Sequence, residues 1–179
     1  MSEDLLSRIV IAEERPEDID GIRRVNHAAF KGDYEADVVD RLRRNCAEIL
    51  SLVAKDGDQV VGHILFSPAY IVPAEGEAVN GMGLAPLAVQ PEFQGQGIGA
   101  ALSQEGMARM KAAGYPFVIV LGHPAYYPRF GFTRASAYGI LSTFENVPDD
   151  AFMICVFDPA ALQGVRGMAH YRPEFVEGD

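Results

Sequence analysis

The chain has 179 residues, enough for one domain whose hydrophobic core needs no disulfide or metal. Hydrophobic residues make up 49% of it and charged residues 22%, a balance typical of a folded soluble protein rather than a disordered one. Lys and Arg number 15 against 25 Asp and Glu, so the formal net charge is −10. This excess of acids argues against non-specific nucleic-acid binding and against docking on an anionic membrane. It suits a cationic partner such as an amine.

The use of cysteine and the N-terminal segment predict a cytoplasmic protein. Cys46 and Cys155 share no spacing motif, which excludes a disulfide scaffold or a zinc ribbon and fits a reducing compartment. The first dozen residues carry acids where a signal peptide needs positive charge. No stretch reaches the roughly 18 apolar residues that a membrane-spanning helix needs.

The first half of the chain predicts two helices followed by a hairpin. Pro16, with two acids behind it, opens the first helix, because proline and acids both suit a first turn. Apolar residues from Ala36 to Leu42 are spaced for one face of the second. Asp56-Gly57 predicts the turn of the hairpin. The expected elements are a strand at Leu6–Ala12, helices at Pro16–Ala29 and Glu35–Arg44, and strands at Leu50–Ala54 and Gln59–Ser67.

The second half alternates strands with helical or turn segments. Pro86 interrupts an apolar run, and because proline cannot donate to a ladder we expect a bulge or a splayed edge there. The expected elements are a strand at Gly83–Gln90, a helix at Ile98–Ala113 capped by Gly114, a strand at Phe117–Leu121, and strands near Gly131–Arg134 and Ala151–Phe157. Strands and helices mixed around one sheet predict an α/β or α+β class. Since no linker divides the chain, we expect a single domain over residues 1–179.

A glycine-rich loop is the most informative stretch of the sequence. Gly95, Gly97 and Gly99 stand between an apolar strand and an amphipathic helix. Glycine removes side-chain bulk, so that successive backbone N–H groups can point into one concave nest. The first N–H groups of the following helix have no partner inside it and lie at the positive end of its dipole. Together these groups predict a pyrophosphate site that needs no Lys or Arg.

Two other nucleotide-binding motifs fit this loop poorly. A Walker A loop needs Gly-Lys-Ser or Gly-Lys-Thr, which the chain lacks. The dinucleotide fingerprint matches the spacing Gly95-x-Gly97-x-x-Ala100, but it follows its strand almost directly and needs an acid about 20 residues later. Here Gln90–Gln94 intervene, and the later position holds Gly122-His123. A third interpretation is a glycine turn that only lets the strand and the helix pack closely.

The wider pattern resembles the GNAT superfamily of acyl-CoA-dependent N-acetyltransferases. Its signature, a strand ending in Val-x-Pro and then Gln-x-x-Gly-x-Gly at a helix start, is matched by Val89-x-Pro91 and by Gln94-x-x-Gly97-x-Gly99. The resemblance implies a GNAT-like fold with a central mixed sheet flanked by helices, and acetyl-CoA as cosubstrate without a metal. It also implies pantetheine pairing at Leu87, Ala88 and Val89, and pyrophosphate binding by Gln94, Gly95, Gln96, Gly97, Ile98, Gly99 and Ala100.

A tyrosine is the expected catalytic residue. Members of the family place a tyrosine four residues before the glycine of a Gly-Phe pair, and Tyr127 holds that position before Gly131-Phe132. By this resemblance, its phenol protonates the departing thiolate. Tyr126 is the reserve candidate. The alternative for Tyr127 is an aromatic residue that packs on the sheet and has only a structural hydrogen bond.

The general base is not identified by the sequence. Asp33, Glu35 and His123 are weak candidates, each with a surface or packing role as its alternative, and Glu92 lies too near the phosphate loop. His63 lies within a strand, where a structural role is expected. Nothing has the spacing of a metal site.

The sequence therefore predicts transfer of an acetyl group from acetyl-CoA to a primary amine, by direct attack in a ternary complex. The expected partner is an amine-bearing small molecule or peptide, with no nucleic acid and no membrane, and a homodimer is left open. One alternative is an acyl-CoA-binding sensor with little or no catalysis, which the missing strand carboxylate favours. Another is a nucleotide-dependent oxidoreductase.

Overall fold

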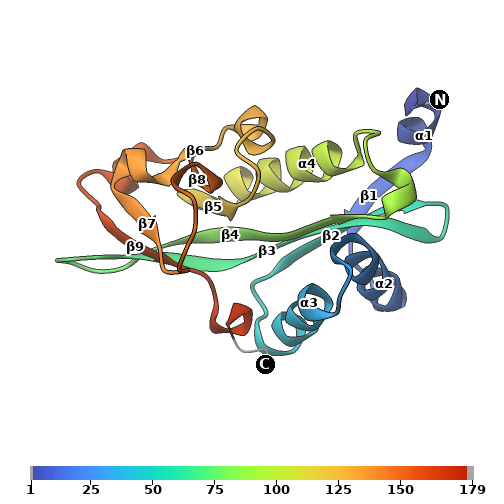
Figure 1. Ribbon diagram of the computed structural model, residues 1–179, viewed down its shortest axis with the longest axis horizontal. Coiled ribbons are helices and arrows are strands. Elements are labelled where there is room, and N and C mark those ends of the chain that lie inside the picture. The colour runs from blue at the N-terminus through green and yellow to red at the C-terminus, as the bar shows by residue number, and fades with distance from the viewer. Residues whose placement is uncertain (1, 177–179) are drawn as a thin grey trace. The chain divides into compact units, whose positions relative to one another are not determined.

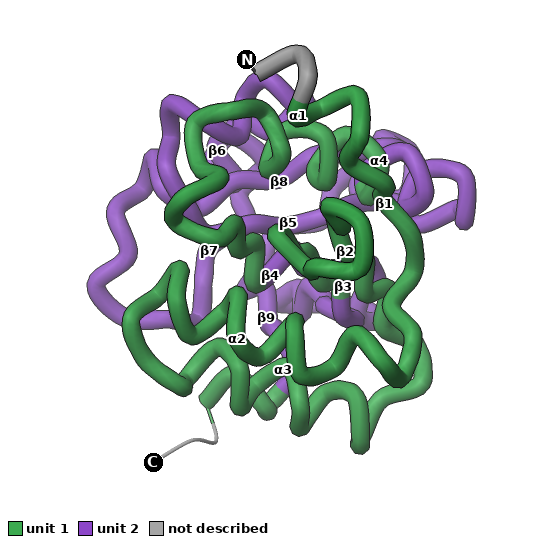
Figure 2. The backbone as a smooth tube through the Cα atoms, turned by 90° about the vertical axis from the view of Figure 1, so that its right-hand side faces the viewer, with its two compact units in different colours: residues 1–66, 86–106, 173–179 green, residues 67–85, 107–172 purple. Residues whose placement is uncertain are grey.

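The computed structural model describes residues 2–176. The chain forms two compact units: residues 1–66, 86–106 and 173–179 belong to unit 1, and residues 67–85 and 107–172 to unit 2 (Figure 2). The helices are α1 (Ser2–Arg8), α2 (Ile19–Phe30), α3 (Tyr34–Asn45) and α4 (Ile98–Ala112). The strands are β1 (Ile9–Glu13), β2 (Leu50–Asp56), β3 (Gln59–Pro73), β4 (Val79–Val89), β5 (Phe117–Leu121), β6 (Thr133–Arg134), β7 (Ile140–Ser142), β8 (Phe152–Val156) and β9 (Gly167–His170).

Unit 1 is built on three antiparallel strands. β1 pairs with β2 from Ile9 opposite Asp56, and β2 pairs with β3 from Leu50 opposite Phe66. The expected hairpin turn is confirmed, with Gly57 in the left-handed region at φ 62°. α2 and α3 pack their apolar stripes on this sheet, where burial of each large aliphatic side chain contributes about 1.5–3 kcal/mol. The shared core contains Ile22, Val25, Val38, Val39, Leu42, Val53, Val60, Leu65 and Ala88.

The start of α4 packs on the opposite side of the same strands (Figure 1). A Cβ at Gly62 of β3 would lie 3.0 Å from Ile98 and from Leu102, so glycine allows the helix to approach the sheet closely. Gly106 likewise lies against the ring of Phe66. These two glycines let α4, which follows the glycine-rich loop, lie close to the sheet.

Unit 2 contains a mixed sheet. β4 and β5 are parallel, with Met82 opposite Val118 and Leu84 opposite Val120. β8 is antiparallel to both β5 and β6, whereas β9 is antiparallel to β3 and parallel to β7. The predicted α/β class, with a mixed sheet flanked by helices, is confirmed. The single domain over residues 1–179 stays a prediction.

The structure corrects the expected elements at several places. The strand expected at Leu6–Ala12 begins at Ile9, because residues 2–8 form the helix α1. β3 continues to Pro73, past the expected end at Ser67, because its later residues pair with β9. β7 and β9 were not expected, since strands of three and four residues have no recognisable periodicity. Over residues 2–176, no helix combines the length and hydropathy of a membrane span.

Candidate active site

The glycine-rich loop forms a tight turn directly before α4. Gly95 and Gly97 adopt left-handed conformations at φ 76° and φ 93°, which residues with a side chain rarely accept. Glycine is required at position 95 by this backbone conformation and not by lack of room, because nothing lies within 4 Å of a Cβ placed there. Gly99 differs from this pair, since it is the second residue of α4. The backbone turn therefore depends on Gly95 and Gly97.

The N-terminal end of α4 offers free backbone donors to this loop. The first bond of the helix runs from the Ala101 N–H to the Gly97 carbonyl at 3.0 Å. The N–H groups of Ile98, Gly99 and Ala100 precede it, so they have no carbonyl partner within the helix. No Lys or Arg occurs between Lys55 and Arg109. To an anion, the loop and the start of α4 therefore offer backbone amides and the positive end of the helix dipole, with no cation from residues 56–108.

Side-chain amides brace the loop against the end of β4. Gln94 Nε2 donates to the Val89 carbonyl at 2.9 Å, and Gln96 Nε2 donates to the Glu92 carbonyl at 3.4 Å. The Gln90 N–H donates to the Val61 carbonyl of β3 at 2.8 Å. These bonds fix the loop before any ligand arrives, which lowers the entropy that binding must overcome.

The predicted irregularity in β4 coincides with the end of a ladder. The parallel pairing with β5 ends at Leu84, two residues before Pro86. Beyond the proline, Ala88 is buried in the core under α2 and α3, while Leu87 and Val89 are half-buried and point to the other face. The Val89 carbonyl already accepts the bond from Gln94. Pairing of a ligand with the backbone of Leu87–Val89 stays a prediction.

Tyr127 lies at the start of a short 3-10 helix, η3 (Tyr127–Phe130), and within a group of aromatic rings. Its ring lies 5.0 Å from that of Tyr126 and 5.7 Å from that of Phe132, both in edge contact. Gly122, directly after β5, is in close contact with the same ring. Burial, with a smaller effect of Tyr126, raises the pKa of the Tyr127 phenol well above its usual value near 10. A phenol that stays protonated at neutral pH is able to donate a proton.

Tyr171 is a second buried tyrosine, which the sequence interpretation missed. It follows β9, is only 9% exposed, and its hydroxyl lies 3.4 Å from the carbonyls of Leu84 and Ile119. Burial, together with nearby Tyr127, raises the pKa of its phenol far above the usual range. The sequence does contain a signal that a large group packs here, namely Gly83 within a strand, because such a glycine often marks the close approach of another group.

The candidate bases have exposed or half-exposed surroundings. Asp33 pairs with His27 at 2.7 Å near the start of α3, and Glu35 lies in the first turn of that helix. Glu92 is exposed and accepts a bond from Gln90 at 3.3 Å. His123 is exposed, and its carbonyl accepts bonds from the amides that open the turn before η3.

Ser51 and His63 resemble a nucleophile and its general base, but their hydrogen bonds indicate a structural role. Asn26 Nδ2 donates to the Ile22 carbonyl at 3.0 Å and contacts His63 Nδ1 at 3.1 Å, so Nδ1 is the acceptor. His63 Nε2 therefore carries the proton and donates to Ser51 Oγ at 2.8 Å. In this tautomer His63 cannot take the proton of Ser51.

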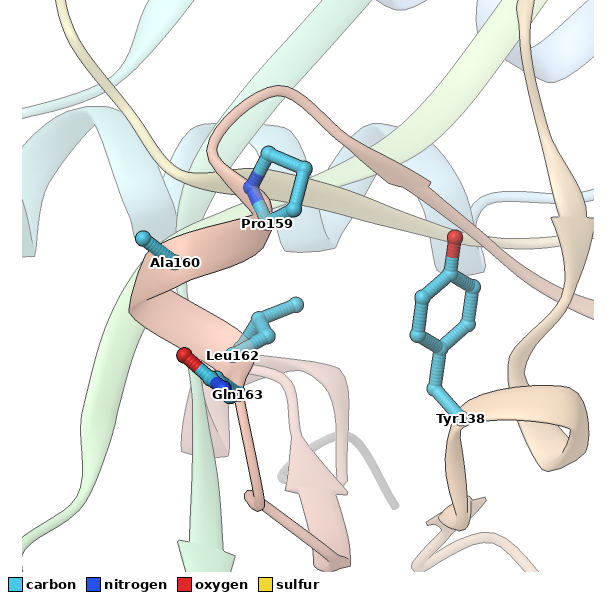
Figure 3. A pocket seen from close by; sticks show the side chains of 5 residues that line it. All are labelled: Tyr138, Pro159, Ala160, Leu162 and Gln163. Carbon is cyan, nitrogen blue, oxygen red and sulfur yellow. The ribbon is translucent and has the colours of Figure 1, made fainter.

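Unit 2 also has an open pocket with a volume of about 480 Å³ (Figure 3). It is lined by Tyr138, Pro159, Ala160, Leu162 and Gln163. The lining has no carboxylate and no histidine, so it has no group to accept the proton of an amine. Among residues 2–176, no group of His, Cys, Asp and Glu is arranged to hold a metal.

Known proteins match the chain over most of its length. Residues 11–135 match the family model of the acetyltransferase (GNAT) domain. The uncharacterized N-acetyltransferase YhbS of Escherichia coli is 36% identical over 168 residues, covering 93% of this chain and 98% of that protein.

Two solved structures resemble the fold. A crystal structure of Escherichia coli YhbS in complex with CoA has a TM-score of 0.86 and 36% identity, covering 95% of this chain and 93% of that one. A GNAT family acetyltransferase from Brucella melitensis, solved in complex with acetyl-CoA, has a TM-score of 0.74 and 36% identity, covering 93% and 97% of the two chains. With a glycine turn before α4, a parallel ladder that ends before Pro86 and this match to the family model, the chain belongs to the GNAT family of acetyltransferases.

Proposed function

We propose that the protein transfers the acetyl group of acetyl-CoA to a primary amine by direct attack in a ternary complex. The observation that carries the proposal is the braced turn at Gly95 and Gly97, which leaves the amides of Ile98–Ala100 open at a helix N-terminus. The two relatives solved with CoA and with acetyl-CoA support the same ligand.

Residues Gln94–Ala100 would bind the pyrophosphate, with Leu87–Val89 pairing with the pantetheine chain. The resulting local positive potential favours the anion even in a chain of net charge −10. The same net charge favours a cationic acceptor, an amine-bearing small molecule or peptide. A free alkyl amine is mostly protonated near pH 7, so the fraction that can attack rises with pH.

Tyr127 would act as the general acid. As the amine nitrogen bonds to the thioester carbon and the C–S bond breaks, sulfur takes the electron pair and the phenolic proton. The new amide releases one proton to water, and the phenolate recovers its proton from solvent. The raised pKa keeps the phenol protonated at neutral pH, as a proton donor must be.

Calorimetry with CoA, followed by acetylation of a panel of amines, tests the proposal. We expect CoA to bind and to raise the thermal midpoint, and at least one polyamine, amino acid, antibiotic or peptide to be acetylated. Absence of CoA binding would refute the proposal. Binding without turnover on any of these amines would favour a CoA-binding sensor, the alternative suggested by the lack of a carboxylate in residues 83–90.

A further inference from the structure

The Tyr171 phenol is held between two neighbouring strands of unit 2. Its hydroxyl lies 3.4 Å from the Leu84 carbonyl of β4 and 3.4 Å from the Ile119 carbonyl of β5. A hydroxyl has one proton, so it donates to one of these carbonyls at a time. Both distances are long for an O–H···O bond, which leaves each interaction weak and sensitive to small shifts of either strand.

These two carbonyls lie at the end of the parallel ladder. Leu84 pairs with Val120, the last paired position before Pro86, and Ile119 precedes Val120 on β5. A hydroxyl that contacts a carbonyl of each strand at this last paired position helps to hold the two strands together where the ladder ends. The backbone of Leu121 also interacts with the phenol and partly offsets the rise in its pKa.

The ring of Tyr171 occupies a place that only a glycine leaves open. A Cβ on Gly83 would lie 2.5 Å from Tyr171 Cε1 and 2.8 Å from Cδ1. The ring centre of Phe144 lies 5.9 Å from that of Tyr171. The phenol is thus held by packing as well as by its hydroxyl, which gives it a fixed position relative to β4.

The same strand end supports Tyr127. Gly122 directly follows Leu121, and the Tyr127 ring packs on it. After burial, Tyr127 is the next cause of the raised pKa of the Tyr171 phenol. A displacement of the end of β5 would therefore move Gly122 and the Tyr127 ring that packs on it.

We propose that Tyr171 is a positioning residue for acetyl transfer: its hydroxyl holds β4 and β5 where their pairing ends, and so fixes the Tyr127 phenol and keeps water from it. This inference rests on the proposed function, in which Tyr127 is the general acid. Tyr171 makes no bond to the substrate in this proposal.

Tyr171→Phe tests the inference, because phenylalanine keeps the packing on Gly83 and removes only the hydroxyl. Tyr70→Phe is the matched control: its ring stacks on His170 at 4.8 Å, and its side chain is 37% exposed. For Tyr171→Phe we expect kcat to fall about tenfold, because small misplacements of a reacting group are costly, with KM for acetyl-CoA changed less than about twofold. Tyr70→Phe should leave both constants unchanged.

A pH profile separates positioning from a general loss of stability. Once water reaches the Tyr127 phenol, its pKa returns toward about 10. The activity of Tyr171→Phe should therefore decline above about pH 9.5, where the wild type keeps its activity. Tyrosinate absorbance should show one more residue titrating below about pH 11 in Tyr171→Phe, a signal that is lost in the double variant Tyr171→Phe/Tyr127→Phe.

Gly83→Ala provides a second route to the same perturbation, because it displaces the ring and keeps the hydroxyl. It should reproduce the loss in kcat and the change in pH profile. An active wild type with unchanged kcat and pH profile in Tyr171→Phe would overturn the inference alone. A wild type that neither binds CoA nor acetylates any amine would overturn the proposed function, and the inference with it.

Discussion

Lowering the pH should destabilise the protein through His63. This side chain is fully buried, and burial lowers its pKa from 6.5 to about 3, with opposing effects of Glu14 and Arg43. A histidine whose pKa is lowered by folding stays neutral in the folded state, while the unfolded chain takes up a proton below pH 6.5. The lowered pKa of His63 therefore leaves stability unchanged above pH 6.5, and it reduces the free energy of unfolding as the pH falls from 6.5 toward 3.

The size of this effect follows from the two pKa values. Each pH unit below 6.5 costs about 1.4 kcal/mol, so the loss between pH 8 and pH 5 is about 2 kcal/mol. Urea unfolding of the wild type and of His63→Gln at both pH values measures it. The variant is less stable at pH 8, because glutamine cannot reproduce both bonds to Asn26 and Ser51. Its stability should nevertheless depend less on pH, by about 2 kcal/mol.

His123→Gln is the control for this experiment, because its imidazole is exposed and folding does not remove it from water. It should keep the pH dependence of the wild type. If the wild type and His63→Gln lose the same free energy between pH 8 and pH 5, then His63 is not held neutral by burial, and the argument for its tautomer fails as well.

Three further predictions concern the loop, the general acid and the half-buried ion pair of Glu14 with Arg43. Gly95→Ala and Gly57→Ala both place a side chain at positive φ with open space around it, and each should cost about 1 kcal/mol of stability. Only Gly95→Ala should weaken CoA binding, by about tenfold in calorimetry, and equal affinities would remove the turn from the pyrophosphate site. Tyr127→Phe should lower kcat by about 10²–10⁴-fold in steady-state kinetics and leave the Kd of CoA nearly unchanged, whereas retained turnover would exclude it as the acid. Glu14 accepts bonds from Arg43 at 2.6 and 3.0 Å; burial tends to raise the pKa of this carboxyl, but Arg43 and Ser51 outweigh burial and lower it. Glu14→Gln should therefore lower the free energy of unfolding by about 1–3 kcal/mol, measured with urea at pH 7. The difference in free energy between wild type and variant should shrink below about pH 4.5, where the carboxylate is protonated in the unfolded chain. A difference that does not change with pH would contradict the ion pair.

The parts of the site that were predictable from the sequence depend on local chemistry. Positive φ at Gly95 and Gly97, the start of α4 at Ile98 and the interruption at Pro86 are each encoded within a few residues. Proline has no N–H to donate, and glycine alone accepts the left-handed region readily, so these residues leave few backbone alternatives. The two early helices were predictable for a similar reason, since their apolar faces repeat with the helical period.

Long-range pairing was less predictable. β9 has four residues, and only its partners β3 and β7 make it a strand. The role of His63 also depends on three other elements, because Asn26, Ser51 and Glu14 come from separate parts of the chain. A propensity assigned within a window of residues has no access to such partners.

The sequence of β4 indicates that large side chains pack against this strand, but it does not identify them. Gly81 and Gly83 alternate within the strand, where glycine is otherwise unfavourable, and so they predict that two large groups lie against one face. The structure supplies Phe117 at the first and Tyr171 at the second. Phe117 was already expected as part of a strand, whereas Tyr171 lies 88 positions after Gly83 and outside any periodic segment. The glycines therefore specify the shape of the site, and only the folded chain identifies the phenol that fills it.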